Sequence, residues 1–228
     1  MEQKKTKVDI LQGLTRAQYD DVLGCGFTKI LPQNTVLFHQ GDNAINCYLV
    51  KSGKLKLSKI SEHGREVIIR YIYAGELTAA VSVLKDTEYP ATAESIEETE
   101  VIGWDKSTII SMMKKTPDIA INSLTAVLER LEELQNRYLE LCSEKVEQRV
   151  ANAILRLSKA AGIKTSRGIC INIPLSRQNI ADYTGTTIYT ASRILSEWEK
   201  RGWIKSERGK ITISNPHALM VFSEQGQE

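Results

Sequence analysis

Apolar positions recur at two spacings along this chain of 228 residues, and the spacing changes near Pro117. Before that point, short alternating runs separated by glycines predict strands. The predicted strands occupy residues 35–39, 47–51, 54–61, 67–73, 91–95 and 99–105. Gly41, Gly53, Gly64 and Gly75 follow one another at intervals of 12, 11 and 11 residues, which is hairpin spacing. The pattern predicts an all-β sandwich or barrel, preceded by one or two short helices within residues 1–23.

After Pro117 the apolar residues step at about 3.5 positions, which predicts a long amphipathic helix with a coiled-coil seam. The seam consists of Leu124, Val127, Leu128, Leu131, Leu134, Gln135, Tyr138, Leu141 and Cys142. Such a helix either pairs with a second copy or packs against its own β domain. The stripe is narrow and charged on both flanks, whereas a helix lying on a sheet has a wider apolar face, so the pattern favours a dimer.

The C-terminal part of the sequence predicts a helix over 144–161, a strand over 168–173, and then two short helices joined at Gly185. Ser176 is a suitable N-cap for the first of these helices, and glycine suits the tight turn between them. Buried positions are predicted at Ile180, Ala181, Ala191, Ile194, Leu195 and Trp198. A β-hairpin over 203–213 follows. The order is that of a winged helix-turn-helix, whose second helix reads DNA.

Composition restricts the class of protein without changing this picture. Apolar residues make up 42%, charged residues 25%, and the net charge is +2, so the chain is an ordinary globular protein rather than a generally basic nucleic-acid coat. A local basic surface is predicted at Arg193, Lys200, Arg201, Lys205 and Arg208. No apolar run approaches the roughly 20 residues of a membrane helix, and the N-terminus lacks a signal pattern, so we expect a cytoplasmic protein with no membrane partner. The cysteines, at 25, 47, 142 and 170, form no C-x-x-C pair, which favours reduced thiols over a metal or redox site.

Four motifs in this order resemble the Crp/Fnr superfamily of transcription regulators. They are FHQGD at 38–42 with YLVKSGKLKL at 48–57, GEL at 75–77, EQRVANAILRL at 147–157, and LSRQNIADYTG at 175–185 with TASRIL at 190–195. The resemblance implies an α+β protein with an N-terminal β jelly-roll sensor domain similar to cyclic-nucleotide-binding domains, a long dimerisation helix and a C-terminal winged helix-turn-helix domain. We place these parts at 1–116, 117–143 and 144–228. The implied partners are a second copy of the chain, double-stranded DNA with a two-fold symmetric site, RNA polymerase and a small effector.

In this family the exposed side of the recognition helix contacts bases. The matching residues are Ile188, Tyr189, Ser192 and Arg193. The Arg193 guanidinium fits O6 and N7 of guanine, and Ser192-Arg193 resembles the fumarate–nitrate branch, which reads a TTGAT-like half-site. Tyr189 stands where many members carry glutamate, so the preference at that base is left open. Phosphate and register contacts are expected at Ser176, Arg177, Gln178, Thr186 and Thr187; for Arg177 a solvated surface charge is the alternative.

The sensor domain departs from the family's cyclic-nucleotide pocket. That pocket uses a Gly-Glu-Leu segment and a following arginine that holds the cyclic phosphate. Gly75-Glu76-Leu77 is present, but Tyr89-Pro90 replaces the arginine, and no arginine occurs between residues 71 and 119. A buried phosphate without a cation is poorly compensated, which disfavours cyclic AMP. We expect an effector at the junction of the sheet and the long helix, near Gly75, Glu76, Leu77, Tyr89, Thr92, Leu128 and Gln135.

The identity of the effector stays open. The segment 79–95 resembles the nitric-oxide-responsive branch, and a haem sensor of nitric oxide or CO would draw axial ligands from His39, His63 and Cys47. A thiol sensor at Cys25 or Cys142, a small apolar or aromatic acid, and a constitutively DNA-binding protein with a purely structural β domain are the alternatives. A four-cysteine iron–sulfur cluster is disfavoured because Cys25 alone lies near the N-terminus. Enzyme activity is disfavoured because the sequence has no phosphate-binding glycine loop, metal-binding histidine pair or nucleophile elbow.

Overall fold

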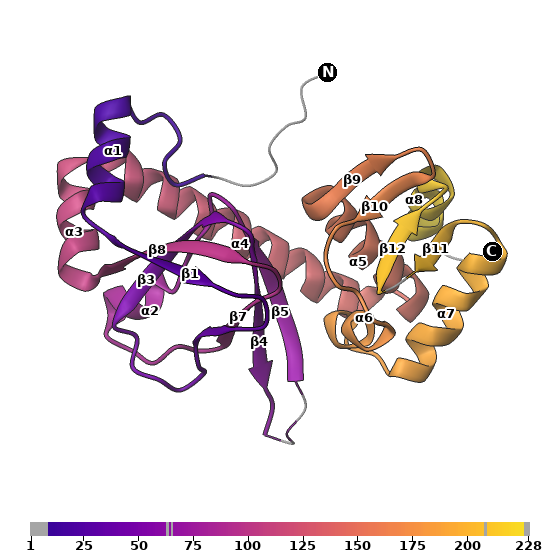
Figure 1. Ribbon diagram of the computed structural model, residues 1–228. Coiled ribbons are helices and arrows are strands. Elements are labelled where there is room, and N and C mark those ends of the chain that lie inside the picture. The colour runs from indigo at the N-terminus through magenta and orange to yellow at the C-terminus, as the bar shows by residue number, and fades with distance from the viewer. Residues whose placement is uncertain (1–8, 63, 65, 208, 226–228) are drawn as a thin grey trace. The chain divides into compact units, whose positions relative to one another are not determined.

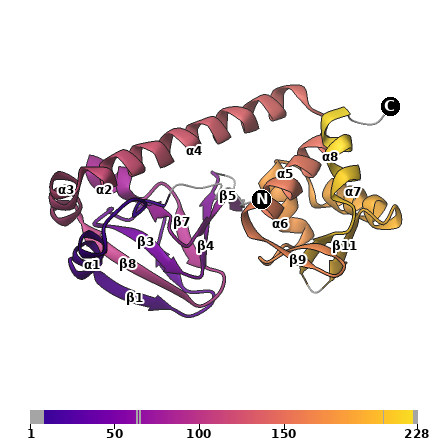
Figure 2. The same ribbon diagram turned by 90° about the horizontal axis from the view of Figure 1, so that it is seen from above.

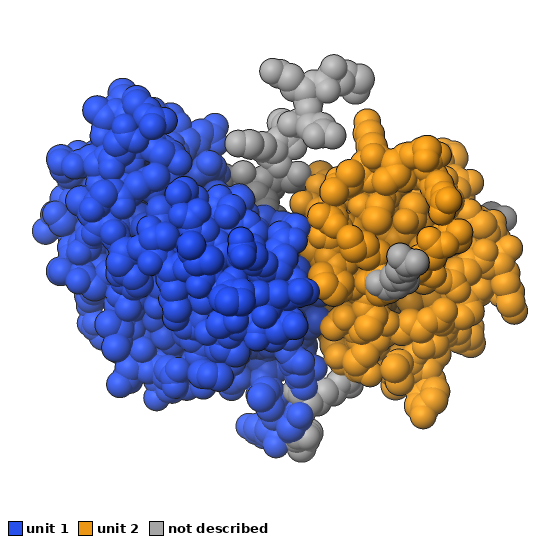
Figure 3. Space-filling view, in the orientation of Figure 1, with its two compact units in different colours: residues 1–133 blue, residues 134–228 orange. Residues whose placement is uncertain are grey.

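The computed structural model describes residues 9–62, 64, 66–207 and 209–225. The chain divides into two compact units, Met1–Glu133 and Leu134–Glu228, which are coloured separately in Figure 3. The described residues of the first unit form two sheets and those of the second form one, and each unit has its own buried core.

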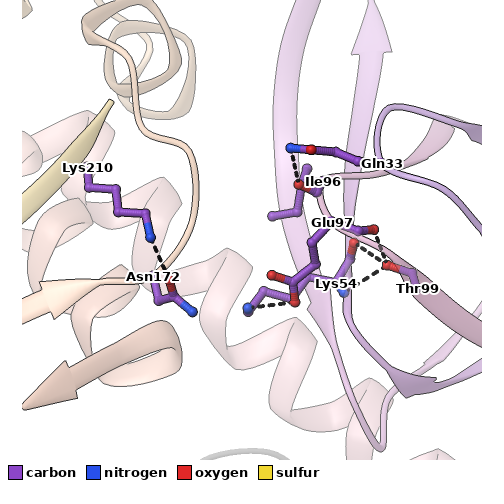
Figure 4. A network of polar contacts seen from close by, with 7 residues as sticks. All are labelled: Gln33, Lys54, Ile96, Glu97, Thr99, Asn172 and Lys210. Atoms are coloured by element: carbon purple, nitrogen blue, oxygen red, sulfur yellow. Dashed lines mark hydrogen bonds and ion pairs between the residues drawn. The ribbon is translucent and has the colours of Figure 1, made fainter. Parts of the chain in front are cut away.

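The first unit is a β sandwich with helices on one side (Figure 1). One antiparallel sheet has the order β1-β8-β3-β6 and the other β2-β7-β4-β5. The strands are β1 (Phe27–Leu31), β2 (Val36–Phe38), β3 (Asn46–Ser52), β4 (Lys54–Ile60), β5 (Glu66–Tyr73), β6 (Leu77–Thr78), β7 (Thr92–Ser95) and β8 (Thr99–Asp105). At the start of β4, Lys54 donates hydrogen bonds from its backbone to Thr99 and from its side chain to Glu97 (Figure 4).

Strand β3 explains why the sandwich has two cores. Its successive side chains point to opposite faces: Tyr48 and Val50 join the core between the two sheets, and Cys47 and Leu49 join the core under the helices. Both faces are therefore buried, and the strand reads as a nearly continuous apolar run.

The helices on the outer core are α1 (Arg16–Gly24), α2 (Ala80–Lys85) and α3 (Lys106–Lys115). A capping box at Thr15 begins α1, and the Asp105 carboxylate caps α3 by accepting from the Thr108 amide. Trp104 of β8 donates from Nε1 to the carbonyl of Val22 at 3.2 Å, which attaches α1 to the sheet.

Helix α4 (Pro117–Ser143) is one unbroken helix that leaves the sandwich (Figure 2). Proline at its first position is compatible with a helix start. Within the first unit its inward side carries buried Ile119 and also Asn122, whose side chain donates to the carbonyl oxygens of Ile10 and Gln12. Its other large apolar residues are exposed, namely Ile121, Leu124, Val127, Leu128, Leu131, Leu134, Tyr138, Leu139 and Leu141.

The second unit is a winged helix-turn-helix. Its elements are α5 (Val146–Ala161), β9 (Gly162–Thr165), β10 (Gly168–Ile171), α6 (Arg177–Thr184), α7 (Ile188–Lys200), β11 (Ile204–Glu207), β12 (Lys210–Ile213) and α8 (Pro216–Gln225). The strands form an antiparallel sheet of order β11-β12-β10-β9. At the start of the central strand β12, the side chain of Lys210 donates to the Asn172 side chain at 2.9 Å (Figure 4). Phe222 of α8 packs edge-on against Trp198 and contacts Trp203.

The predicted fold class is confirmed: a β jelly roll is followed by a long helix and a winged helix-turn-helix. All six predicted strands of the jelly roll are present within a few residues, as is α4 over the predicted 117–143. Six elements were not predicted, namely β1, β6, α2, α3, β9 and α8. Of the predicted N-terminal helices, α1 is present, and residues 1–8 lie outside the described residues.

Candidate functional site

The helix-turn-helix is fixed by local signals at each end. Ser176 and Asn179 form a capping box at the start of α6, and Gly185 ends it in the left-handed region at φ 66°. Thr187 then caps α7 by accepting from the Thr190 amide. A side chain at Gly185 would be strained by this backbone conformation, so the turn between the two helices depends on glycine.

Helix α7 has one buried and one exposed side. Ala191, Ile194, Leu195 and Trp198 are buried as predicted. On the other side Tyr189 is 85% exposed and Ile188 40% exposed, Arg193 is exposed and Ser192 half-buried. The residues expected to contact bases therefore lie together on the accessible side of one helix.

Arg193 has a partner in the second unit that the sequence did not indicate. Its Nη2 donates to Oε1 of Glu147 at 2.9 Å, and Glu147 lies in the first turn of α5. The pKa of Glu147 is lowered by a backbone hydrogen bond and by Arg193, with Lys145 adding a smaller effect, while partial burial opposes the change. The carboxylate is thus charged at neutral pH and forms an ion pair with Arg193.

The residues expected to contact DNA phosphates form hydrogen bonds within the DNA-binding domain. Arg177 spans from α6 to α7, where Nη1 donates to the carbonyl of Ser192 at 2.7 Å and to Ser196 Oγ at 2.8 Å, and Nη2 meets Glu199 at 3.2 Å. Gln178 donates to Asp182, while Ser176 and Thr187 act as caps. Thr186 follows Gly185 in the turn and its amide donates to the carbonyl of Ala181. Arg177 is therefore a link between the two helices, not a freely solvated charge.

The predicted basic surface is partly neutralised by acidic neighbours. Arg201 pairs with Glu197 at 3.0 Å and lies over the Trp203 ring, and Lys205 pairs with Glu207. Lys200 is exposed, and Arg208 lies outside the described residues. Such surface pairs are weak, so a polyanion can compete for these cations.

In the sensor unit, Glu76 is buried and surrounded by arginines. Arg70 of β5 forms an ion pair with Oε2 of Glu76, and Arg130 of α4 lies 3.6 Å from the same oxygen. Arg130 also pairs with Glu133. Burial lowers the pKa of Arg70, and the charge of Glu76 opposes that effect. The absence of arginine from 71–119 therefore did not mean an absence of cations: Arg70 precedes that window and Arg130 follows it.

The residues predicted for the effector site lie in different environments. Gly75 and Glu76 directly precede β6, and Leu77 is its first residue. Tyr89 is buried in the sandwich core, where it stacks on Phe38 and its hydroxyl donates to the Asn46 carbonyl at 2.8 Å. The side chain of Thr92 accepts from the Gln40 amide. Leu128 and Gln135 are exposed on α4.

The donor set around Glu76 does not fit a cyclic nucleotide. Arg70 and Arg130 carry two positive charges, and Glu76 and Glu133 carry two negative charges, so these four described side chains together have no net positive charge to offset a phosphodiester. Tyr89, which stands where the resemblance implies a phosphate-binding arginine, is a core residue.

The candidate haem ligands fit a haem site no better than the residues around Glu76 fit a cyclic nucleotide. Cys47 is fully buried, its Sγ donates weakly to the Trp104 carbonyl, and burial raises the pKa of its thiol to about 12. A thiol with that pKa is a poor source of the thiolate that binds a metal. His39 is exposed, and His63 lies outside the described residues. Among the residues described, no cluster of three or more histidine, cysteine or acidic side chains is suited to hold a metal ion.

Three residues that the sequence reasoning missed belong to these sites: Glu147, Arg70 and Arg130. Glu147 opens the EQRVANAILRL motif, but nothing in the sequence indicates contact with a residue 46 positions away. Arg130 had a detectable signal, because it is a cation on a predicted helix next to Glu133, three residues along.

Comparison with known families matches both halves of the chain. Residues 28–116 match the cyclic nucleotide-binding domain and residues 148–222 match the Crp-like helix-turn-helix domain. Among the helices of the described residues, no helix has the length and apolar character to span a membrane.

Relatives and solved structures agree with these matches over most of the chain. The chain is 26% identical to the cyclic AMP receptor protein of Thermus thermophilus, over 90% of this chain and 91% of the relative. It is 24% identical to the CRP-like cAMP-activated global transcriptional regulator of Mycobacterium tuberculosis, over 82% and 84%, and 26% identical to the fumarate and nitrate reduction regulatory protein of Salmonella typhimurium, over 86% and 78%.

Among solved structures, a CooA variant from Carboxydothermus hydrogenoformans matches the fold with a TM-score of 0.76 at 20% identity, covering 96% of this chain and 97% of that one. These relatives are transcription regulators, not enzymes. With a sensor domain of the cyclic-nucleotide-binding fold and a DNA-binding helix-turn-helix, this chain belongs to the CRP/FNR family of transcription regulators.

Proposed function

We propose that the protein is a homodimeric, sequence-specific DNA-binding regulator whose sensor domain sets the position of its two reading helices. The observation that carries the proposal is the exposed side of α7, where Ile188, Tyr189 and Arg193 are accessible next to Ser192 while the opposite side is buried. In a helix-turn-helix protein that side enters the major groove.

Arg193 is the proposed base-reading residue. Its guanidinium has five N–H donors in a planar fork, which suits bidentate contact with guanine O6 and N7. Ser192, Ile188 and Tyr189 would read neighbouring base pairs. Ser176, Gln178, Thr186 and Thr187 would contact the DNA backbone from the start of α6 and the turn, and Arg177 would hold the spacing between the two helices.

A second copy of the chain is the proposed occupant of the apolar face of α4. Side chains at Ile121, Leu124, Leu128, Leu131 and Tyr138 follow a 3,4 spacing and are exposed. The inward side of the same helix carries Asn122 and Arg130. Water disfavours such an exposed apolar stripe, and pairing two copies along it buries the stripe. Gln135 falls within the seam, where a polar residue fixes register at some cost in stability.

The proposed effector acts at Glu76 and its arginines. Arg130 lies on α4, so a ligand that rearranges its pairing with Glu76 would alter how this proposed dimerisation helix packs against the sensor domain. That would shift the population between two dimer arrangements with different spacing of the reading helices. Because the charges are balanced, we propose an uncharged or weakly charged small molecule rather than a cyclic nucleotide. RNA polymerase is the proposed protein partner at promoters.

Selection of binding sites from random DNA tests the DNA-reading proposal. The purified protein should select an inverted repeat with half-sites about one helical turn, or 34 Å, apart and with a guanine in each half. Arg193→Ala should lose preference for that guanine while remaining a dimer. Unchanged preference in Arg193→Ala would exclude Arg193 as the reader.

The dimer is tested on α4 with charge-matched variants. Leu131→Asp places a carboxylate in the seam, and Asn136→Asp adds the same charge to an exposed position outside it. Sedimentation should find Leu131→Asp monomeric and Asn136→Asp dimeric. A dimeric Leu131→Asp protein would place the interface elsewhere.

The balanced charges around Glu76 also favour one alternative, a regulator that binds DNA constitutively and uses its β domain only as a scaffold. The affinity for the selected site distinguishes the switch from the scaffold. It is measured on haem-free protein, whose visible spectrum shows no Soret band. A rise in affinity with an added effector supports a switch. Full affinity that no compound changes supports the scaffold.

A further inference from the structure

The ion pair between Arg193 and Glu147 joins a residue proposed to read DNA to a helix outside the helix-turn-helix. Glu147 lies in the first turn of α5, and Arg193 lies in the second turn of α7. The Glu147 side chain is 31% exposed and the Arg193 side chain 69% exposed. The carboxylate is therefore the more enclosed partner, and the guanidinium projects beyond it toward solvent.

Two interactions other than the ion pair with Arg193 stabilise the Glu147 carboxylate. It carries its negative charge at a helix N-terminus, where the exposed amides and the helix dipole stabilise an anion. It also benefits from a backbone hydrogen bond. Glu147 is thus a fixed acceptor, while Arg193 is a long side chain with several rotatable bonds that loses conformational freedom when it is held.

The contact occupies a small part of the Arg193 hydrogen-bonding capacity. The hydrogen bond to Glu147 uses Nη2, one of the three guanidinium nitrogens. Of the five N–H groups of an arginine, one is engaged in this bond, and a bidentate contact with guanine needs two. The ion pair and a base contact are therefore compatible.

We propose that Glu147 is a positioning residue that holds the Arg193 guanidinium in the orientation that reads guanine, so that α5 contributes to the sequence specificity of the DNA-binding domain. This inference rests on the proposed role of Arg193. The negative charge of Glu147 repels DNA phosphates equally on every sequence. Glu147 assists binding where Arg193 contacts its base, so its contribution is to sequence specificity.

The opposite role, a carboxylate that competes with DNA for Arg193, makes a different prediction. Removing a competitor strengthens binding to the selected site. Removing a positioning residue weakens binding to the selected site and leaves or slightly strengthens binding to other sequences, because one negative charge is gone. The ratio of the two affinities therefore distinguishes the roles.

The experiment measures affinity of the full-length dimer for the selected site and for the same site with its guanine replaced, at one fixed salt concentration. Glu147→Ala should lower the ratio of these affinities by a factor of about two to five, the range expected for an exposed ion pair. Glu147→Gln, which keeps a hydrogen-bond acceptor, should restore part of the ratio. Glu197→Ala is the matched control, since it removes from α7 an exposed carboxylate that pairs with Arg201, the C-cap residue of that helix. This control should leave the ratio unchanged.

A double-mutant cycle separates this inference from the proposed function. In an Arg193→Ala background, Glu147→Ala should have no further effect on the ratio. If Arg193→Ala itself keeps the guanine preference, the assignment of Arg193 fails. If Arg193→Ala loses the preference but Glu147→Ala keeps the full ratio or tightens binding to the selected site, the inference about Glu147 alone is overturned.

Discussion

The Arg177 guanidinium donates a hydrogen bond to the backbone carbonyl oxygen of Ser192 at 2.7 Å. The same nitrogen reaches Ser196, and the other terminal nitrogen reaches Glu199, so one side chain from the start of α6 contacts three positions along α7. The carbonyl belongs to a residue on the reading side of α7. Arg177 thus fixes the recognition helix against the helix that precedes it.

Replacing Arg177 by alanine should destabilise the winged domain. The change removes three hydrogen bonds, each worth about 0.5–1.5 kcal/mol net, or about 1.5–4.5 kcal/mol together. Because the Arg177 side chain is 36% exposed, solvent screening reduces this sum, and we expect a loss of about 1–3 kcal/mol in the free energy of unfolding. Urea unfolding followed by tryptophan fluorescence measures it in a Trp104→Phe background, in which Trp198 and Trp203 are the remaining tryptophans. Gln178→Ala, which removes a single exposed contact with Asp182, is the control and should change stability by less than about 0.5 kcal/mol. If Arg177 served DNA phosphates alone, its replacement would leave stability intact and lower the salt dependence of binding by about one ion.

Cys47 should resist thiol reagents in the folded protein. Burial raises the pKa of its thiol to about 12, so the reactive thiolate is scarce at pH 8 and the sulfur is out of contact with solvent. Exposed Cys25 is the internal comparison. Mass spectrometry after brief treatment with iodoacetamide should find Cys25 modified and Cys47 unmodified until denaturant is added. Modification of both at equal rates would show that the core around Cys47 opens readily and would restore Cys47 as a candidate haem ligand.

The sequence predicted best where one periodicity extends over many residues. Helix α4 and the strands with alternating patterns were found because their signals are local and repeated. The short α2 was missed for a physical reason: it has six residues and starts after Ala79 in the left-handed region without a side-chain cap. Helix α8 had a usable signal in Asn215-Pro216, since the Asn215 side chain accepts from the Ala218 amide and proline suits the first helical position.

The site was predictable only in part, because its partners are distant in sequence. The exposed side of α7 follows from helical periodicity alone. The pairing of Arg193 with Glu147, and of Glu76 with Arg70 and Arg130, depends on how separate elements pack. Counting arginines within residues 71–119 failed for the same reason, since strand β5, the loop that follows it and helix α4 bring Arg70, Glu76 and Arg130 together from separate parts of the chain.

Glu76→Gln should destabilise the sensor unit strongly. The neutral amide leaves Arg70, whose side chain is 14% exposed, without its charged partner and close to Arg130. Breaking a buried pair in this way costs about 3–5 kcal/mol. Glu100→Gln is the matched control, since it breaks an ion pair with Lys51 in the same unit whose side chains are 27% and 45% exposed, and it should cost about 0–1 kcal/mol.

Hydrogen exchange of the buried β5 amides measures the effect of these two variants on the stability of the sensor unit, independently of the DNA-binding unit. Protection of the β5 amides should fall steeply in Glu76→Gln and stay near wild type in Glu100→Gln. Equal protection in the two variants would mean that the Arg70 charge is solvated in solution and that the Glu76 network adds little to the stability of the unit.

Glu147 should titrate below the ordinary value for glutamate, and Arg193 should be part of the cause. Its pKa is lowered by a backbone hydrogen bond, by the hydrogen bond and charge of Arg193 and by Lys145. A group whose pKa is lower in the folded than in the unfolded state contributes stability above its unfolded value, near 4.5, and loses that contribution as pH falls through the folded value. Carboxyl carbon NMR of the folded protein between pH 2.5 and 7 measures the midpoint. In Arg193→Ala the midpoint should move upward toward 4.5 but stay below it, because the backbone hydrogen bond remains. An unchanged midpoint in Arg193→Ala would show that the two side chains are not paired in solution.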